Sequence, residues 1–583
     1  MGAGLFFSMN TWIIDFEYCD RIGKPPRAWC VVGSCVETGK IVRLWLDGDA
    51  HPCPFPAPFR MVAHYAAAEL SCFQALGWQA PAEVVDSLAE ARVARGQRSP
   101  EGGWGLLSIA RSLGIASMSS EHKDSMRKIA MEDEVPDDRK ELLIDYCYDD
   151  VVTTARVWEK LSPHVDLRQA VIRGRYLKAL AAVESRGIPV DEGLVRLLMD
   201  RSAEIKDSVW RAARLQHPGT INDKGSFSSR GWLDWCSANS ITWPLLESTA
   251  PRLDADTFKV MSDRHPEIQV MACAKKLRGQ TNAFQFPLHA GRLRCMLSPF
   301  GSDTGRNQPS NSKYIFGASA WLRSVIQAPP GKVLAYIDYS SQEFALAAAL
   351  SQDKAMTEDY NSGDPYMAFA RRGGAVPQGA TKSTHPNERA TYKVVALAVQ
   401  YGMEYRSLAA RNSMSFYEAK QLISQHKEAY PAFWKWRQAV IDTVRCGGTI
   451  STPFGWKRSL GERDTNNSIA NFLVQASGAE VLRVCVTALE EAGFQVVAPV
   501  HDAVMVELNE HNWESELSET RQIMASASQA VVPGVVVRTD VDVTMPGEHF
   551  VDGRGTEVWD LVAPVIGRDV EGNPVPTRNA LES

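Results

Sequence analysis

The first 160 residues combine short apolar runs with longer helical patterns. Trp12–Ile14 and Ala28–Val32 are apolar runs of strand length, and a helical pattern begins at Asp138. Strands and helices in one continuous stretch are typical of an α/β domain. We therefore expect an α/β domain at the N-terminus.

A long amphipathic pattern over Ala170–Gly187 ends at a glycine and is followed by Pro189, which together predict a helix stop. We place a domain junction near residues 165–175. After it the pattern predicts mainly helices over 188–290, Gly- and Ser-rich loops leading into a strand over 291–350, helices over 351–478 and a β-hairpin over 492–507. The tail beyond Pro546 shows no clear pattern, and we find no internal repeat.

Composition places the chain among globular proteins with room for more than one core, because 583 residues are 45% hydrophobic and 23% charged. A net charge of -6 argues against general adhesion to polyanions but does not exclude a basic cleft. The 11 cysteines are dispersed and form no C-x-x-C pair, which favours reduced thiols and no structural metal.

Neither a leader nor a membrane span is evident in the sequence. The segment Met1–Asn10 lacks a basic start and a long apolar core. No window approaches the roughly 18 apolar residues that a bilayer requires. We expect a monomer without membrane contact in the cytoplasm, which is the host cytoplasm if a phage encodes the chain.

Two carboxylates follow strongly apolar strands in the second half of the chain. The run Val333–Ile337 delivers Asp338, and His501-Asp502 interrupts the two apolar runs of the predicted hairpin. An isolated Asp after a strand often caps a helix, but a polar pair inside a hairpin is poorly explained by packing. Two such carboxylates can hold two Mg²⁺ ions about 4 Å apart, as nucleotidyl transfer requires.

Fixed positive charges suited to a triphosphate occur between these carboxylates. Arg389, Lys393, Leu397 and Tyr401 are spaced four residues apart, so they lie along one face of a helix. The segment Val394–Val399 is almost wholly apolar, which favours a packed helix carrying two functional cations over a solvated basic face.

These residues resemble family A DNA polymerases, the bacterial DNA polymerase I class, and in particular its compact phage-encoded members. Asp338-Tyr339-Ser340-x-x-Glu343 resembles motif A, Arg389-x3-Lys393-x7-Tyr401-Gly402 resembles motif B, and His501-Asp502 resembles motif C. Thr304-Gly305-Arg306 is similar to the loop that contacts primer and template, and Asn471-x3-Gln475 to the segment that touches the minor groove. The resemblance covers roughly residues 170 to 545.

The resemblance implies a mixed α/β (α+β) fold in two parts. An RNase H-like exonuclease domain would span 1–170 and a right-hand polymerase domain 171–583. The polymerase domain would comprise a thumb over about 171–290, a palm over about 291–350 and 479–583, and fingers over about 351–478. The basic stretch Ala274–Arg278 of the thumb would contact DNA phosphates without reading sequence, although a solvated helix face explains it equally well.

The resemblance also implies the role of each site residue. Asp338 and Asp502 would be the metal ligands, with the Tyr339 carbonyl completing the shell. Arg389 and Lys393 would bind the incoming phosphates. The remaining positions would contact the substrates: Glu343 as the gate against a 2′-hydroxyl, Tyr401 beside the nascent base pair, His501 near the primer end, and Arg306, Asn471 and Gln475 on the DNA. The partners would be primer–template DNA and deoxynucleoside triphosphates, with Mn²⁺ as a substitute for Mg²⁺.

The sequence departs from the family pattern at several positions. Ser341-Gln342 and Phe344-Ala345 replace the usual residues of motif A without removing a metal ligand. Ala503 stands where a glutamate usually follows the motif C aspartate, and Glu507 is the nearest glutamate in sequence. Leu397 stands where the family often has Phe or Tyr, so we expect stronger discrimination against dideoxynucleotides.

A second set of carboxylates lies in the N-terminal domain. Asp15 and Glu17 are two residues apart on a predicted strand and face the same side. Tyr146 and Asp150 are one helical turn apart. With Glu69 as the fourth acid, the set resembles the DEDDy pattern of 3′→5′ exonucleases, in which Asp15, Glu17, Glu69 and Asp150 hold metal and Tyr146 orients water. Glu69 replaces the usual aspartate and Tyr65 the usual asparagine.

Other functions are compatible with parts of this pattern. The N-terminal domain could be structural, with no exonuclease activity. A single-subunit RNA polymerase shares the right-hand plan and both aspartates, but Glu343 argues against it. A non-catalytic DNA-binding scaffold is a further alternative, against which the complete set Asp338, Asp502, Arg389 and Lys393 argues.

Overall fold

The computed structural model describes residues 9–46, 51–116, 120–280, 286–412, 414–569 and 572. Residues 1–8, on which the expectation of no leader rests, lie outside this part, as does most of the chain after residue 569. The mixed helix and sheet content predicted from the sequence is confirmed.

A mixed five-stranded sheet with the order β3-β2-β1-β4-β5 forms the N-terminal module. Strand β1 runs antiparallel to β2 and parallel to β4. The two apolar runs predicted as strands are confirmed as β1 and β2. The strands are β1 (Asn10–Cys19), β2 (Arg27–Cys35), β3 (Ile41–Trp45), β4 (Phe59–Ala63) and β5 (Glu83–Asp86).

Helices cover both faces of this sheet. Ile13 packs in one buried cluster with residues of α5, whereas Trp12 and Ile14 pack in another with residues of α1, as strand alternation requires. The helices are α1 (Ala67–Ala75), α2 (Ser87–Ala94), α3 (Leu106–Ser112), α4 (Ser120–Ala130) and α5 (Asp137–Leu161), followed by the 3₁₀ turn η1 (Ser162–His164).

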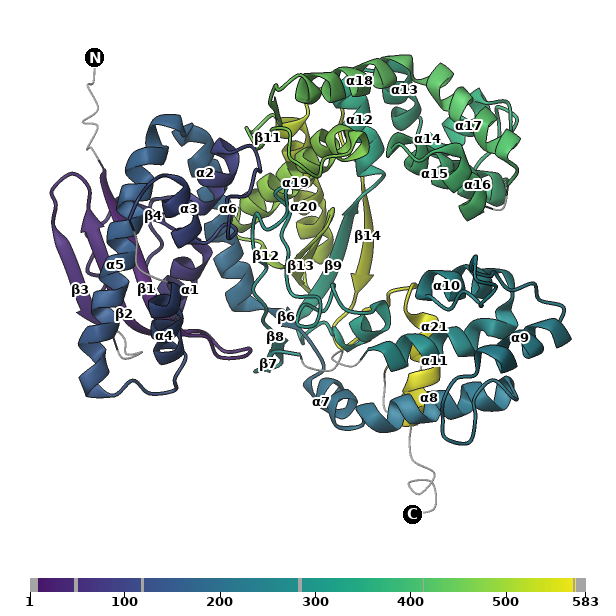
Figure 1. Cartoon of the computed structure of the whole chain (residues 1–583), viewed down its shortest axis with the longest axis horizontal. Helices are drawn as coiled ribbons and strands as arrows, with labels where there is room; N and C mark the ends of the chain where they lie inside the picture. The colour runs from purple at the N-terminus through teal and green to yellow at the C-terminus, as the bar shows by residue number, and fades with distance from the viewer. Residues whose placement is uncertain are drawn as a thin grey trace.

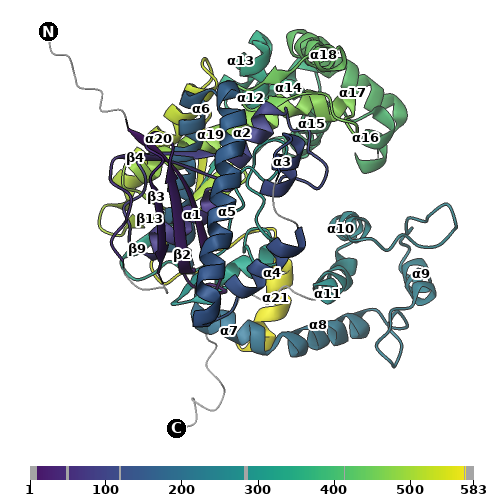
Figure 2. The same ribbon diagram turned by 60° about the vertical axis from the view of Figure 1, so that its left-hand side comes forward.

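One helix connects this module to the rest of the chain. Helix α6 (Leu167–Arg186) begins at Asp166, whose side chain accepts from two backbone N–H groups, and ends at Gly187 with φ +70°, so the predicted stop is confirmed. It packs against α1 and β5 on one side and against α19 (Asn466–Glu491) and β12 (Gln495–Val500) on the other (Figures 1 and 2). The junction predicted near 165–175 therefore falls at the start of a continuous helix that both modules share.

A four-stranded antiparallel sheet with the order β12-β13-β9-β14 lies at the centre of the second module. The predicted strand and hairpin are confirmed as β9 (Lys332–Tyr339), β12 (Gln495–Val500) and β13 (Ala503–Asn509). Strand β14 (Thr539–Thr544) forms one edge, and helix α20 (Trp513–Val531) packs on the sheet.

Two helical lobes extend from this sheet, one above and one below it in the view of Figure 1. The upper lobe contains α12 (Gln342–Ser351), α13 (Lys354–Asn361), α14 (Pro365–Arg372), α15 (Pro386–Gln400), α16 (Tyr405–Asn412), α17 (Phe416–Ala429) and α18 (Pro431–Arg445), with the small hairpin β10 (Ile450–Ser451) and β11 (Lys457–Arg458) after it. The lower lobe contains α7 (Glu192–Asp200), α8 (Ser202–Gln216), α9 (Ser229–Ala238), α10 (Ala255–Arg264), η2 (Pro266–Ile268) and α11 (Gln269–Gly279).

Short elements complete the second module. The strands β6 (Ile188–Pro189), β7 (Leu288–His289) and β8 (Arg292–Leu293) form a small sheet, and η3 (Ala320–Val325) precedes β9. Helix α21 (Thr556–Val562) and η4 (Ala563–Ile566) lie in the tail for which the sequence predicted no element. They pack against the lower lobe, at α8 and α11.

The basic stretch of α11 does not present all of its charges to solvent. Lys275 lies over the rings of Phe227 and Phe258, 3.9 and 4.5 Å from their centroids, and burial lowers its pKa to about 8. Arg278 donates to the Gly225 carbonyl at 2.7 Å. These two residues therefore help to hold the lower lobe together, while Lys276 is exposed.

Helix α19 (Asn466–Glu491) corrects one expectation. By length and composition it is the one helix in the described residues that could cross a membrane. From the sequence we expected no apolar segment of that length. Its apolar window is 78% buried inside the protein. It packs against α6, α12, α18 and α20. Its apolar character is thus explained by packing on several sides.

The contact between α6 and β5 yields a stability prediction. A Cβ atom added at Gly174 would lie 1.9 Å from the Val84 carbonyl oxygen. Because backbone cannot give way cheaply, Gly174→Ala should lower the free energy of unfolding by about 1–3 kcal/mol. Urea denaturation measures this. Gly279→Ala, whose new Cβ would meet nothing within 4 Å, is the control and should change it by less than about 1 kcal/mol. Equal, small effects of both substitutions would contradict the tight contact.

Candidate active sites

The register of the central sheet brings Asp338 and Asp502 together. Asp338 lies near the end of β9 and pairs with Ala503, the first residue of β13. Asp502 precedes Ala503 in the two-residue turn after β12, where His501 has a left-handed backbone with φ +53°. The Tyr339 N–H donates to the Asp502 carbonyl at 3.0 Å. The two carboxylates predicted from separate strands are therefore neighbours.

The two carboxylates form an electrostatically strained pair. Burial and the charges of Asp502 and Asp540 raise the pKa of Asp338 to about 7. Burial also raises the pKa of Asp502. One oxygen of Asp338, Oδ1, is buried and has no hydrogen-bond partner among the described residues. A buried oxygen without a donor, beside a second carboxylate, fits a divalent cation.

Arg306 and His501 lie beside this pair. Burial raises the pKa of Asp502, and the charge of Arg306 opposes this rise. Burial lowers the pKa of His501, and the charge of Arg306 lowers it further. The Arg306 loop is held in place by two donors: the Trp456 indole to the Asp303 carbonyl at 2.8 Å and Arg483 to the Gly305 carbonyl at 2.8 Å. The structure thus brings the Arg306 loop close to Asp502 and His501.

Helix α15 carries both cations expected to bind phosphate. Lys393 is exposed and has no ion pair among the described residues, whereas the Nε of Arg389 donates to Asp364, the N-cap of α14, at 2.9 Å. Arg389 therefore has a protein partner that the sequence did not reveal. The packing predicted for Val394–Val399 is found at Val395, Ala396 and Val399, which are buried, whereas Val394 is 44% exposed. Leu397 is half-buried.

Tyr401 lies at the end of α15 between Glu343 and Gln475. Burial and the nearby Glu343 charge raise the pKa of the Tyr401 phenol. Asn471 donates to the Tyr401 carbonyl at 3.1 Å, and Gln400 donates to the Glu343 carbonyl at 2.9 Å. The structure therefore places Tyr401, which the resemblance puts beside the nascent base pair, next to Glu343, which it makes the gate against a 2′-hydroxyl.

Glu507 does not supply the carboxylate that Ala503 lacks. It pairs with Leu334 in the sheet, four residues along β9 from Asp338. It forms an ion pair with Arg292 at 2.7 Å. The glutamate noted from the sequence is thus a structural residue at the far end of the strand.

The second carboxylate cluster lies on the N-terminal sheet. Ligand atoms of Asp15, Glu17 and Cys147 all lie within 4.8 Å of one another. The Cys147 thiol contacts the Asp15 Oδ2 at 3.3 Å. Burial and the Asp150 charge raise the pKa of Asp15 to about 8, and burial and the Asp15 charge raise that of Glu17.

Glu69, Tyr146 and Asp150 complete this cluster. Glu69 and Asp150 are 3% and 5% exposed, and each has one buried oxygen without a hydrogen-bond partner among the described residues. Burial and the charges of Asp15 and Asp150 raise the pKa of Glu69. Burial and the charges of Glu17 and Asp150 raise the pKa of Tyr146. This buried acidic set also fits divalent cations.

A lysine that the sequence analysis missed lies in the cluster. Lys123 of α4 contacts Asp150 at 2.6 Å. Its charge partly opposes the rise in the pKa values of Asp15 and Glu17 that burial and the neighbouring acids cause. The neighbouring His64 bonds Ser87 and the Trp104 carbonyl. Burial raises the pKa of Tyr65, which replaces the usual asparagine, to about 12. Ser298 of the second module lowers this pKa, and Glu69 of the cluster is among the carboxylates that raise it.

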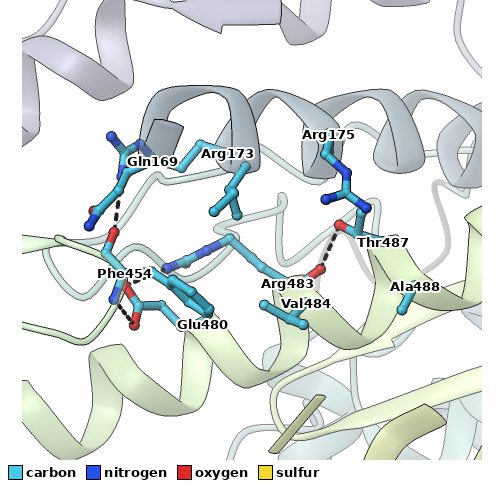
Figure 3. Close-up of a pocket in the computed structure, with 10 residues that line it drawn as sticks. Gln169, Arg173, Arg175, Phe454, Glu480, Arg483, Val484, Thr487 and Ala488 are labelled. Atoms are coloured by element: carbon cyan, nitrogen blue, oxygen red, sulfur yellow. Dashed lines mark hydrogen bonds and ion pairs between the residues drawn. The ribbon is translucent and has the colours of Figure 1, made fainter. Parts of the chain in front are cut away.

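A cavity of about 160 Å³ separates α6 from α19, and Figure 3 shows its lining. Arg173 of α6 donates to the Phe454 carbonyl at 3.2 Å, and the Phe454 N–H donates to Glu480 of α19 at 3.1 Å. Arg173 also makes two 2.7 Å bonds to Glu90 of α2. Neither carboxylate cluster lines the cavity, which is part of the contact between modules.

Comparison with known proteins places this architecture. Residues 307–547 match the sequence model of DNA polymerase family A, and the matched stretch contains Asp338, Arg389, Lys393 and Asp502. Over these residues the chain is similar to DNA polymerase family A. A DNA polymerase of Mycobacterium phage D29 is 25% identical over 445 residues, 72% of this chain and 70% of the phage protein.

One bacterial relative matches this chain over less than half of its own length. A thermostable DNA polymerase I of Thermus thermophilus is 24% identical over 61% of this chain, and the match covers only 46% of the Thermus protein. The fold is similar to that of the POL domain of Pol1 from M. smegmatis, solved in complex with DNA primer-template and dNTP. The TM-score is 0.68 at 20% identity, over 92% of this chain and 94% of that chain.

Two residues of the N-terminal carboxylate cluster could not be predicted from the sequence, because only folding brings them there. Lys123 reaches Asp150 from a different helix, and Cys147 joins Asp15 through helix-to-strand packing. The sequence signal for Cys147 was its position between Tyr146 and Asp150. No local pattern marked Lys123.

The buried acids predict a pH effect on metal-free protein. Burial and the Asp150 charge keep the Asp15 carboxyl protonated in the folded state up to a pKa of about 8, whereas its ordinary pKa is 3.8. The folded state binds more protons between those values, so its stability should fall as the pH rises from about 5 to about 8. In urea denaturation, Asp15→Asn plus Glu17→Gln should flatten this slope. Mg²⁺ should restore stability at pH 8 only in the wild type. Equal slopes without metal would refute the assignment.

Proposed function

We propose that the chain is a template-directed DNA polymerase that extends a primer 3′ end with deoxynucleotides during DNA replication. The juxtaposition of Asp338 and Asp502 at the end of the central sheet carries this proposal. The match of residues 307–547 to the sequence model of DNA polymerase family A supports it, as does the similar Pol1 domain, which was solved with DNA primer-template and dNTP.

The proposed site would hold divalent cations at Asp338 and Asp502. Bound Mg²⁺, or Mn²⁺ in its place, would supply Lewis-acid chemistry that favours ionisation of an attacking hydroxyl and stabilises a leaving pyrophosphate. The residues of the chain would position the substrates. Lys393 offers an unpaired ammonium to the triphosphate, and Arg389 would share its guanidinium between phosphate and Asp364.

The substrate sugar would be read by Glu343 and Tyr401. The Glu343 charge acts on the Tyr401 phenol, so the two side chains are neighbours. Beside a bound nucleotide, this carboxylate and phenol would favour a sugar without a 2′-hydroxyl. This supports a DNA polymerase over a single-subunit RNA polymerase. Efficient incorporation of ribonucleotides by the purified protein would favour the RNA polymerase.

We further propose that the N-terminal module is a 3′→5′ exonuclease that proofreads the primer end. Three buried acids and the half-buried Asp15 support this function, together with two oxygens that have no hydrogen-bond partner among the described residues. A purely structural module is the alternative, and Lys123 favours it to the extent that its ammonium neutralises Asp150 without metal. Mismatch removal distinguishes the two.

A primer-extension experiment tests both activities. Asp338→Ala should reduce synthesis by more than the roughly 10–100-fold that losing an outer partner of a metal site costs. Asp15→Ala plus Glu17→Ala should abolish removal of a mismatched end and leave synthesis intact. Asp145→Ala is the control, because this carboxylate is exposed on α5 and contacts Arg43.

The outcomes separate the proposals. Persistent synthesis by Asp338→Ala would refute the polymerase site. No extension by the wild type with either Mg²⁺ or Mn²⁺ would favour a DNA-binding scaffold. Equal mismatch removal by the wild type and the Asp15→Ala, Glu17→Ala variant would refute the exonuclease site.

A further inference from the structure

Asp338 has a second carboxylate beside it in the central sheet. Strand β9 is flanked by β13 on one side and by β14 on the other. Asp338 pairs with Ala503 in β13 and with Asp540 in β14. Both neighbours lie directly opposite Asp338, so all three side chains project from the same face of the sheet. On that face an alanine stands on one side of Asp338 and an aspartate on the other.

This face is the one that carries the candidate polymerase site. Along β9, Ala335, Ile337 and Tyr339 are buried on the opposite face, while Tyr336 and Asp338 are partly exposed. Along β14, Asp540 and Asp542 are exposed on the face of Asp338 and Tyr336. The negative charge of Asp540 acts on Asp338.

Asp540 has no cation of its own among the described residues. Its side chain has neither a hydrogen bond nor an ion pair there, although the Asp338 carboxyl lies directly across from it in the sheet. Arg554 is the nearby cation that acts on Asp338, but it is committed to Asp552 through bonds of 2.9 and 2.8 Å. Like charges directly opposite each other are destabilising in a sheet. An added cation would relieve that repulsion.

We propose that Asp540 is a third carboxylate ligand of the divalent cations held by Asp338 and Asp502. The inference rests on the proposed polymerase function and extends it by one residue. It explains why an acidic side chain is placed at the edge strand directly opposite Asp338. It also explains how the site has three carboxylates although position 503 is an alanine.

Asp542 provides a matched control for this role. It lies two residues along the same strand, on the same face and with similar exposure, but it pairs with Tyr336 instead of Asp338. Asp540→Asn and Asp542→Asn therefore make the same chemical change at the same edge. Only the first removes a carboxylate opposite Asp338.

Ala503 provides a rescue. It faces Asp338 from the other neighbouring strand, so Ala503→Glu would return a carboxylate to the same face. The double variant Ala503→Glu, Asp540→Asn keeps three acids at the site in a mirrored arrangement. A merely structural role of Asp540 in β14 would not be rescued from β13.

The test uses the full chain with Asp15→Asn and Glu17→Gln, which removes metal binding at the other cluster. Free Mn²⁺ is measured by EPR during titration of the protein bound to a primer–template with a dideoxy-terminated primer and the matching deoxynucleotide. Asp540→Asn should weaken Mn²⁺ binding by about tenfold or more. Asp542→Asn should leave it unchanged, and Ala503→Glu should restore part of the loss. The Mg²⁺ concentration for half-maximal primer extension should shift in the same direction.

The outcomes distinguish this inference from the function on which it rests. If the parent chain binds Mn²⁺ and extends primers, but Asp540→Asn behaves like Asp542→Asn, the third ligand is refuted and the polymerase stands. If Ala503→Glu fails to restore a loss caused by Asp540→Asn, the ligand role is also refuted. If the parent neither binds Mn²⁺ at this site nor extends primers, the proposed function fails and the inference with it.

Discussion

The antiparallel register between β9 and β13 is the constraint on which the candidate polymerase site depends. It places Asp338 opposite Ala503 and therefore beside Asp502, the preceding residue in the turn. A slip of one residue would turn Asp338 to the buried face of the sheet and separate the acids. Because seven consecutive residue pairs join β9 and β13, with β14 fixed on the other side, the acids are held together despite their mutual repulsion.

In both carboxylate clusters, burial and neighbouring acids raise the free energy of the ionised carboxylates, and a bound cation would lower it. Burial disfavours ionised acids, and neighbouring acids add to the effect, as the raised pKa values of Asp15 and Asp338 show. Packing alone gives no reason to bury several acids around unpartnered oxygens. The same physical argument therefore supports a metal role at both sites, although only the N-terminal cluster contains a lysine among its acids.

Helix α6 makes the two modules mechanically continuous. Its Arg173 binds Glu90 of the N-terminal module and the Phe454 carbonyl of the second module. Arg92 of α2 also reaches across, to the Gly301 carbonyl at 3.1 Å and to Asp303 at 3.3 Å. Residues 301–306 lead to Arg306, so the N-terminal module touches the loop that borders the polymerase site. A primer end moving between the two sites would remain on one connected framework.

Local patterns predicted much of the fold. The apolar run before Asp338 and the two runs around His501-Asp502 predicted β9 and the β12–β13 hairpin, and Gly187 with Pro189 predicted the end of α6. Contacts between distant segments could not be predicted in the same way. The pairing of β14 with β9, the bond from Arg389 to Asp364 and the insertion of Lys123 beside Asp150 depend on tertiary packing. The structural role of Glu507 could not be predicted for the same reason, because its ion-pair partner Arg292 lies more than two hundred residues earlier in the chain.

A structure of the chain with primer–template DNA, an incoming deoxynucleotide and Mg²⁺ tests the central claim most directly. The account predicts metal density between Asp338 and Asp502, with the nucleotide phosphates against Lys393 and Arg389 of α15. A nucleotide bound elsewhere, with both aspartates free of metal, would contradict it.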